Sequence, residues 1–129
     1  MTIRPATIQD LPAVHALLAA NDLLVDGVDY SDFSPPLLVA VKDSVIVGMI
    51  HAVIGRPYAI VTELAIAPAE HRKGYGVTLL RAMELLVRSM GITACAAYVG
   101  GGRISVIQQI SREGWTATGV GQMFVRSLT

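Results

Sequence analysis

The stretch "ELAIAPAEHRKGYGVTLLRAMELL", residues 63–86, predicts a strand joined to a helix by a short basic loop. Its first residues form an apolar run that ends at Pro68, as expected of a strand. Arg72 and Lys73 follow in the loop, and two glycines stand where an amphipathic helical pattern begins. A unit of this kind places the N-terminus of a helix next to the end of a sheet strand.

The two glycines, Gly74 and Gly76, favour an anion site at this junction. Glycine lets backbone N–H groups approach an anion closely, and the first turn of a helix presents unpaired N–H groups at its positive end. Neither the P-loop pattern G-x-x-x-x-G-K-[ST] nor the dinucleotide pattern G-x-G-x-x-G is present. The junction therefore predicts a phosphate site of another kind, the alternative being an ordinary basic and flexible loop.

Hydrophobic periodicity in the whole sequence predicts an α+β fold. Helices are expected at 7–20, 76–90 and 103–114, and strands at 2–4, twice within 37–55 on either side of a turn at 42–44, at 58–68, at 92–99, and twice within 115–128. Antiparallel strands come first and strand–helix–strand crossovers follow, so we expect a mixed, mostly antiparallel sheet with helices on both faces. In the second helix, Arg81, Glu84 and Arg88 fall opposite the apolar side.

The composition indicates one globular domain that spans residues 1–129. Hydrophobic residues make up 53% of the sequence and charged residues 16%, which suits a buried core and excludes a disordered chain. Ten basic residues balance ten acidic ones, so the chain lacks the excess positive charge of nucleic-acid-binding proteins. The high apolar share is compatible with a homodimer that forms through an exposed apolar patch.

The sequence also indicates a cytoplasmic protein that uses neither a membrane anchor nor a metal. Cys95 is the single cysteine, which fits a reducing compartment, and its apolar surroundings indicate a buried thiol. No apolar run reaches the roughly 18 residues that cross a bilayer. Asp10 and Pro12 interrupt the N-terminus where a signal peptide requires an apolar segment. No group of His, Cys and carboxylate residues has the spacing of metal ligands.

The segment His71-Arg72-Lys73-Gly74-Tyr75-Gly76 resembles the acyl-CoA-binding motif [Q/R]-x-x-G-x-[G/A] of the GCN5-related N-acetyltransferase (GNAT) superfamily. "TELAIAP", residues 62–68, is similar to the strand and proline that precede this motif in the family. The resemblance covers most of the chain, since "IRPATIQDL" (3–11) is similar to the usual family start and "SREGWTATG" (111–119) to the end of its last helix. It implies the GNAT fold, acetyl-CoA as co-substrate, and transfer of an acetyl group to a primary amine of a small molecule or a protein.

The resemblance also implies which residues bind acetyl-CoA. In this family the backbone of one strand pairs with the pantetheine arm, while the next strand, here the one of Tyr98, splays away to make room. Backbone amides of the loop and of the first helical turn hold the pyrophosphate. The residues that match these roles are Leu64, Ala65 and Ile66 for pantetheine, and His71, Arg72, Lys73, Gly74, Tyr75, Gly76 and Val77 for the phosphates.

Glu63 is the candidate general base, because the family commonly uses a carboxylate on the strand before the motif. Glu63 is also the only ionisable residue between Tyr58 and Glu70, and it lies in an apolar strand. We expect burial to raise its pKa toward the range that suits a general base. The alternative is a structural carboxylate that pairs with an arginine or with a backbone N–H.

Two positions depart from the family pattern. His71 stands where the motif has Gln or Arg, and Ile110 stands where many relatives have the tyrosine that protonates the leaving thiolate. Tyr98 is our first candidate for a replacement acid, followed by Ser105 and Ser111. Two alternatives stay open: Tyr98 only packs at the end of its strand, or the thiolate of CoA leaves without an acid.

The segment "NDLLVDGVDYSDFSPP", residues 21–36, suggests a cationic acceptor amine. It holds four aspartates and no basic residue, so it could attract a polyamine, an aminoglycoside-like molecule, or a lysine or N-terminal amine of a protein. A solvated acidic loop is the alternative. His51, within an apolar strand, is interpreted as a structural histidine. A second function stays open, in which a GNAT-like domain binds CoA or a partner protein without turnover.

Overall fold

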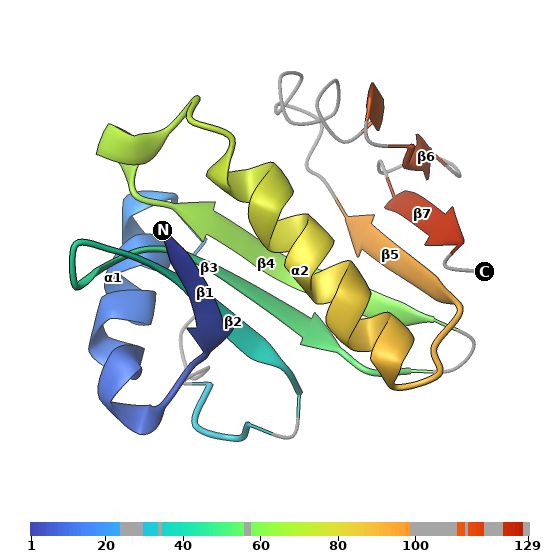
Figure 1. Ribbon diagram of the computed structural model, residues 1–129, viewed down its shortest axis with the longest axis horizontal. Coiled ribbons are helices and arrows are strands. Elements are labelled where there is room, and N and C mark those ends of the chain that lie inside the picture. The colour runs from blue at the N-terminus through green and yellow to red at the C-terminus, as the bar shows by residue number, and fades with distance from the viewer. Residues whose placement is uncertain are drawn as a thin grey trace.

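A mixed sheet organises the part of the chain that the structure describes. The computed structural model describes residues 1–23, 30–33, 35–55, 58–98, 111–112, 114–117 and 123–127. The sheet order is β1-β2-β3-β4-β5-β7-β6 (Figure 1), and every neighbouring pair is antiparallel except β4 and β5. The elements are β1 (Thr2–Pro5), α1 (Leu11–Ala20), β2 (Leu37–Lys42), β3 (Val45–Val53), β4 (Ala59–Ile66), α2 (Tyr75–Ser89), β5 (Ala94–Tyr98), β6 (Thr116–Ala117) and β7 (Met123–Ser127). The predicted mixed, mostly antiparallel sheet is confirmed.

Helices α1 and α2 cover opposite faces of this sheet (Figure 1). Side chains alternate along β2, so that Leu38 and Ala40 belong to the core under α2, whereas Leu37 and Val39 belong to the core under α1. The helices contribute Leu79, Leu80, Met83 and Val87 from α2, and Leu11, Val14, Leu17 and Leu18 from α1. The prediction of helices on both faces is therefore confirmed.

Helix α1 begins later than predicted, because a 3-10 turn at Ile8–Asp10 precedes it. Pro12 fits the first turn of α1, where the missing N–H would have no helical acceptor. The Asp10 carboxylate accepts hydrogen bonds from the Thr7 N–H at 2.7 Å and from two nitrogens of Arg4 at 2.7 and 3.0 Å. Asp10 thus ties β1 to the start of the helix.

The turn between β2 and β3 lies where the sequence predicts a hairpin. Its two central residues, Asp43 and Ser44, have φ angles of +51° and +65°. A two-residue turn with both residues in the left-handed region matches the twist of the strands that it joins. This hairpin brings Lys42 close to the loop that follows β4.

β5 runs beside β4 for only three residue pairs. The paired residues are Ala59 with Cys95, Ile60 with Ala96, and Val61 with Ala97. Beyond this point β4 continues from Thr62 to Ile66, whereas β5 diverges from it and stays paired with β7 (Figure 1). The predicted splay is seen only at Tyr98, because the residues that follow it, 99–110, lie outside the described residues.

Helix α2 has a wider buried side than the sequence predicts. Glu84, expected on the exposed side with Arg81 and Arg88, is buried, whereas both arginines are exposed. The reason is that the indole N–H of Trp115 donates a 3.1 Å hydrogen bond to Glu84 Oε1. Trp115 joins the core under α2 and so covers a side of the helix that the periodicity assigns to solvent.

The C-terminal predictions are tested only in part. Of the helix predicted at 103–114, the structure describes residues 111–112, which are helical, and residue 114. Strands β6 and β7 pair antiparallel, as predicted for the last hairpin, whose turn lies outside the described residues. Within the described residues, neither α1 nor α2 is long and apolar enough to cross a membrane.

We predict that Asp10→Asn lowers the Tm at pH 7 by roughly 3–6 °C, because the variant weakens the bonds to Thr7 and Arg4. The hydrogen bond from Arg4 is the main cause that lowers the pKa of Asp10 in the folded protein below its ordinary 3.8. A lowered pKa stabilises the fold above pH 3.8, and this contribution is lost as the pH falls below it. Thermal unfolding at pH 7 and pH 3 should show a smaller difference between the two proteins at pH 3, and an equal difference would contradict this account.

Candidate active site

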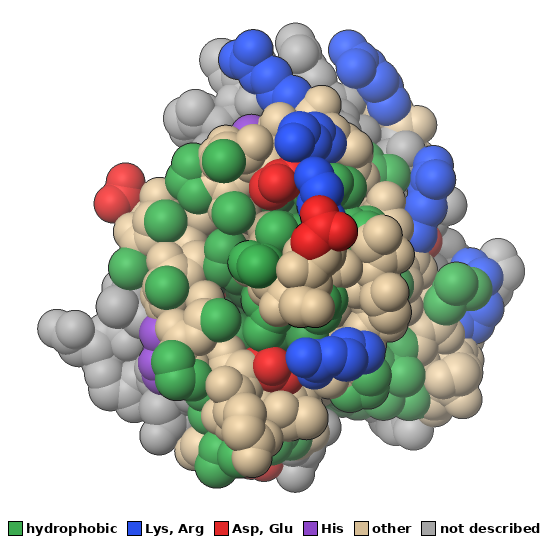
Figure 2. All heavy atoms as spheres, turned by 60° about the vertical axis from the view of Figure 1, so that its left-hand side comes forward, with side chains coloured by type: hydrophobic (Ala, Val, Ile, Leu, Met, Phe, Trp, Pro, Cys, Tyr) green, Lys and Arg blue, Asp and Glu red, His purple; other side chains and the backbone are tan. Residues whose placement is uncertain are grey.

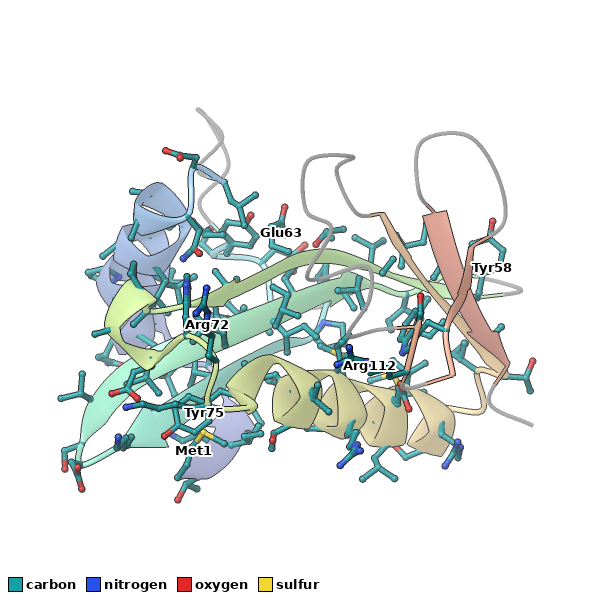
Figure 3. The ribbon with its side chains drawn as sticks, turned by 90° about the horizontal axis from the view of Figure 1, so that it is seen from above. Met1, Tyr58, Glu63, Arg72, Tyr75 and Arg112 are labelled. Atoms are coloured by element: carbon teal, nitrogen blue, oxygen red, sulfur yellow. The ribbon has the colours of Figure 1, made fainter. Side chains whose placement is uncertain are left out.

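The loop between β4 and α2 has the backbone geometry of an anion site. A 3-10 turn at Pro68–Glu70 leads to Arg72, with a φ of +66°, and to Gly74, the N-cap residue of α2, with a φ of +82°. Among the described residues no side chain caps the helix, so the N–H groups of residues 75–77 stay without a capping partner, as is typical of a first helical turn. Figure 3 shows Arg72 and Tyr75 at this junction. The predicted phosphate loop is therefore built as an uncapped helix N-terminus.

Glu70 forms ion pairs with two lysines beside this loop. Its carboxylate lies 2.8 Å from the Nζ of Lys73 and 3.3 Å from the Nζ of Lys42 in the β2–β3 hairpin. Lys73 is the main cause that holds the pKa of Glu70 below its ordinary value. Figure 2 shows Lys and Arg side chains next to Asp and Glu on one face of the molecule. Lys73, predicted to bind phosphate, thus has an intramolecular partner with which an incoming phosphate must compete.

The His71 side chain binds the end of β4. Its Nε2–H donates a 2.8 Å hydrogen bond to the carbonyl oxygen of Ile66. Asn21, at the end of α1, donates to the same oxygen at 3.0 Å and to Leu17 at 2.8 Å. Two side chains therefore share the Ile66 carbonyl, and His71 anchors the phosphate loop to β4 through its ring.

Beyond Val61, alternate residues of β4 turn their backbone groups toward the side that β5 has left. Ala67 donates its N–H to Val47 in β3 at 2.8 Å, and Ala65 lies opposite Met49. In an antiparallel ladder every second residue bonds to the same neighbour, so the backbone groups of Ala65 face β3. The groups of Leu64 and Ile66 face the other side, where no described strand pairs with them; this side is called the open side of β4 below. Of the three predicted pantetheine partners, these two residues offer backbone groups there, and the Ile66 carbonyl is already shared.

Glu63 lies at a β-bulge between β3 and β4. Glu63 pairs with His51, but the next pair joins Val61 with Ala52, so Thr62 is an extra residue in β4. His51 Nδ1 lies 2.6 Å from the Thr62 hydroxyl, which lies 2.6 Å from Glu63 Oε2. His51 Nδ1 is also 3.4 Å from that carboxylate oxygen. Figure 3 shows Glu63 on the side of β4 away from α2.

Tyr30 covers this cluster from the segment that precedes β2. Its ring packs edge-on against the His51 ring, with centroids 4.9 Å apart. The Tyr30 hydroxyl is buried and has no hydrogen-bond partner among the described residues. Burial, together with the nearby Glu63 carboxylate, raises the pKa of the phenol, so Tyr30 stays protonated at neutral pH.

The pKa of Glu63 is lowered, so the prediction of a raised pKa is wrong. Burial is the largest single effect and does raise it, as expected. Hydrogen bonding to His51 and Thr62 outweighs burial, the nearby Tyr30 phenol adds a smaller lowering effect, and the pKa falls below its ordinary 4.5. The sequence suggests no such donors, because Thr62 would face the opposite side in a regular strand.

The remaining predicted residues lie outside this cluster or outside the described residues. Tyr98 ends β5, one residue beyond the last pair with β4, and its backbone pairs with Met123 of β7. Ser111 is exposed on the short helical stretch near the C-terminus. The candidate positions that fall outside the described residues are Ser105 and Ile110, together with Asp26 and Asp29 of the acidic segment.

Cys95 is buried in the sheet, as its apolar surroundings predict. Burial raises the pKa of its thiol to about 11, which keeps the sulfur protonated. Within the described ranges, no three His, Cys, Asp or Glu residues gather into a group that could hold a metal ion. The site of interest therefore consists of the phosphate loop, the open edge of β4, and the Glu63 cluster.

The Acetyltransferase (GNAT) family model matches residues 9–107 of the sequence. The chain belongs to this family. The match includes the open edge of β4, Glu63 and the whole phosphate loop. A search of curated proteins finds no matching sequence.

Solved structures of GNAT proteins share this fold along nearly the whole chain. Ard1 from Thermoplasma volcanium has a TM-score of 0.86 at 16% identity, over 99% of this chain and 97% of its own. The ribosomal-protein-S18-alanine N-acetyltransferase from Escherichia coli has a TM-score of 0.81 at 14% identity, over 99% and 94%. YncA, a putative acetyltransferase from Salmonella typhimurium with acetyl-CoA, has a TM-score of 0.83 at 20% identity, over 100% and 94%. At these identities the likeness shows that the fold is the GNAT fold.

The two glycines of the loop should respond in opposite ways to alanine. Gly74→Ala places a side chain on a residue with a φ of +82° and should lower the free energy of unfolding by about 1 kcal/mol. Gly76 lies inside α2, where a Cβ would meet only Leu64 Cδ2 at 3.8 Å, so Gly76→Ala should keep or raise stability. Urea unfolding of both variants tests this difference, and a Gly74→Ala protein as stable as wild type would contradict it.

Proposed function

We propose that this protein is an N-acetyltransferase that moves the acetyl group of acetyl-CoA to a primary amine, with Glu63 as general base. The observation that carries the proposal is the layout of β4: its open edge leads from Glu63 to the uncapped N-terminus of α2. Membership in the GNAT acetyltransferase family supports acetyl transfer. The Salmonella protein of the same fold was solved with acetyl-CoA, which supports the choice of co-substrate.

The described residues fit the phosphate and pantetheine parts of acetyl-CoA. In the proposal, the backbone N–H groups of residues 72–77 bind the pyrophosphate, and Arg72 and Lys73 add positive charge. Leu64 and the N–H of Ile66 bind the pantetheine amides as an added strand would. His71 contributes by holding the loop against β4 rather than by reaching the phosphates with its ring.

Glu63 supplies the base that acetyl transfer to an amine requires. Acetyl-CoA provides an activated thioester. A cationic acceptor first releases one proton to solvent, and the nitrogen of the neutral amine then loses a second proton as it attacks the carbonyl carbon. Because the pKa of Glu63 is lowered, its carboxylate is ionised at neutral pH and can accept that proton. The C–N bond forms and the C–S bond breaks, while the N–H of Leu64 would polarise the carbonyl oxygen.

We assign the acceptor to the class of cationic amines. The support is the acidic composition of segment 21–36, of which the structure describes Asp22, directly after α1, and Asp32, two residues after Tyr30. The E. coli protein of the same fold is named for an alanine of ribosomal protein S18, which makes the N-terminal amine of a protein one candidate acceptor. A polyamine, an aminoglycoside and a lysine-containing peptide are the others.

The first experiment combines thermal shift with acetyl-CoA and a thiol-release assay. Spermidine, kanamycin, a lysine peptide and a peptide with an N-terminal alanine serve as acceptors. Stabilisation by acetyl-CoA together with amine-dependent thiol release supports the proposal. Stabilisation without release on a broader amine panel would favour a CoA-binding module, and the absence of any stabilisation by acyl-CoA would overturn both.

We predict that Glu63→Gln lowers kcat by roughly 100-fold or more while the Kd for acetyl-CoA stays the same, because glutamine cannot accept the proton. Asp43→Asn, at the tip of the β2–β3 hairpin, is the matched control for loss of a carboxylate at the opposite end of β3 from His51 and Glu63. Steady-state kinetics and calorimetric titration with acetyl-CoA check both variants. Full activity of Glu63→Gln would remove Glu63 from the mechanism.

We also propose Tyr98 as the acid that protonates the CoA thiolate, because it ends β5 at the opening between β4 and β5. Tyr98→Phe should then lower kcat about tenfold with little change in the KM for acetyl-CoA. Single-turnover thiol release measures this step. An unchanged rate would mean that the thiolate leaves unaided and that Tyr98 only packs at the strand end.

A further inference from the structure

We infer that His51 and Thr62 are positioning residues for Glu63, which hold one oxygen of its carboxylate and leave the other to the acceptor amine. The inference rests on the proposed role of Glu63 as base. It assigns a function to His51, which its sequence position presents as an ordinary buried histidine, and to Thr62, which has no role in the motif.

The β-bulge is what makes this arrangement possible. In a regular strand, Thr62 and Glu63 would point to opposite faces of the sheet. Because both residues lie opposite His51, their side chains reach the same imidazole. The result is a chain of short contacts, 2.6 Å from His51 Nδ1 to the Thr62 oxygen and 2.6 Å from that oxygen to Glu63 Oε2.

The chemistry of the three groups determines where the hydrogens lie. An ionised carboxylate can only accept, so the Thr62 hydroxyl donates to Glu63 Oε2. The Thr62 hydroxyl has a single hydrogen, and its other possible acceptor, the backbone carbonyl of His51 at 3.3 Å, would form a weaker hydrogen bond than the carboxylate does. The Thr62 oxygen must then accept from His51, which requires the hydrogen of the imidazole to be on Nδ1. The same Nδ1 faces Glu63 Oε2 at 3.4 Å.

This network distinguishes the two oxygens of Glu63. Among the described residues, the Thr62 hydroxyl and His51 Nδ1 both approach Oε2, and these two contacts leave Oε1 available. The carboxylate cannot rotate without breaking a 2.6 Å bond. A base whose free oxygen has a fixed direction needs no reorganisation when the amine arrives.

The surroundings keep this arrangement rigid and leave Glu63 as the base. Among the described residues, the titratable groups that face the carboxylate are His51 from β3 and Tyr30 from the segment before β2. His15 of α1 lies behind Tyr30, with ring centroids 6.2 Å apart. The Tyr30 ring packs on His51 and restricts the imidazole. Helix α2 contributes no group here, because it covers the opposite face of the sheet.

Thr62→Val and Thr62→Ser form a matched pair for the kinetic test, since both keep a small side chain and only valine lacks the hydroxyl. Loss of this donor raises the pKa of Glu63, so the acidic limb of the kcat/KM profile for the acceptor moves to higher pH. On that limb kcat/KM should fall about tenfold in Thr62→Val, with an unchanged KM for acetyl-CoA, and Thr62→Ser should recover most of the loss. Identical limbs in wild type and Thr62→Val would overturn the inference.

A second measurement does not depend on turnover. The ¹⁵N chemical shifts of His51, assigned with His51→Gln, should show hydrogen on Nδ1 in wild type, and the ¹³C titration of Glu63 should move to higher pH in Thr62→Val. Hydrogen on Nε2 of His51, or an unchanged Glu63 titration, would overturn the inference. Failure of the proposed function is seen separately, as wild-type protein that gives no thiol release with any amine.

Discussion

β4 pairs with β3 along nearly its whole length but with β5 for only three residues, and the whole site depends on this difference in pairing. A strand in the middle of a sheet normally pairs along both of its edges, because unpaired backbone groups are costly to bury. Here the groups of Leu64 and Ile66 remain on the open side, and the Ile66 carbonyl is satisfied by His71 and Asn21. The fold therefore leaves a short piece of β4 without a strand partner on this side among the described residues.

The Glu63 cluster depends on the pairing of β4 with its other neighbour, β3. The bulge opposite His51 brings Thr62 and Glu63 to one side, and the sheet separates this polar cluster from the apolar core under α2. A carboxylate that loses water needs donors in exchange, and here the imidazole and hydroxyl provide them. Burial and hydrogen bonding thus act in opposite directions on Glu63, and hydrogen bonding is the stronger of the two.

Some features of this region cost stability without any structural benefit in the described residues. Tyr30 adopts a φ of +60° and buries a hydroxyl that has no hydrogen-bond partner there. Each feature is worth of order 1–3 kcal/mol, and such costs concentrate at functional sites. Tyr30 lies where the core under α1 meets the Glu63 cluster, and the position of both features next to Glu63 agrees with the proposed catalytic use of this side of the sheet.

The sequence by itself determined the fold class, the order of the described elements, the hairpin at Asp43 and Ser44, and the glycine-containing loop before α2, because each follows from local periodicity or from local turn and glycine chemistry. The helical pattern of α2 could not reveal that Glu84 is buried, since its partner Trp115 is distant in the sequence. Only the tertiary structure decided the environment of Glu63, the direction of the Leu64 and Ile66 backbone groups away from β3, and the contact of His71 with the end of β4. The physical reason is that a one-residue bulge and the divergence of two strands leave no trace in sequence periodicity, yet they decide which side chains and backbone groups meet.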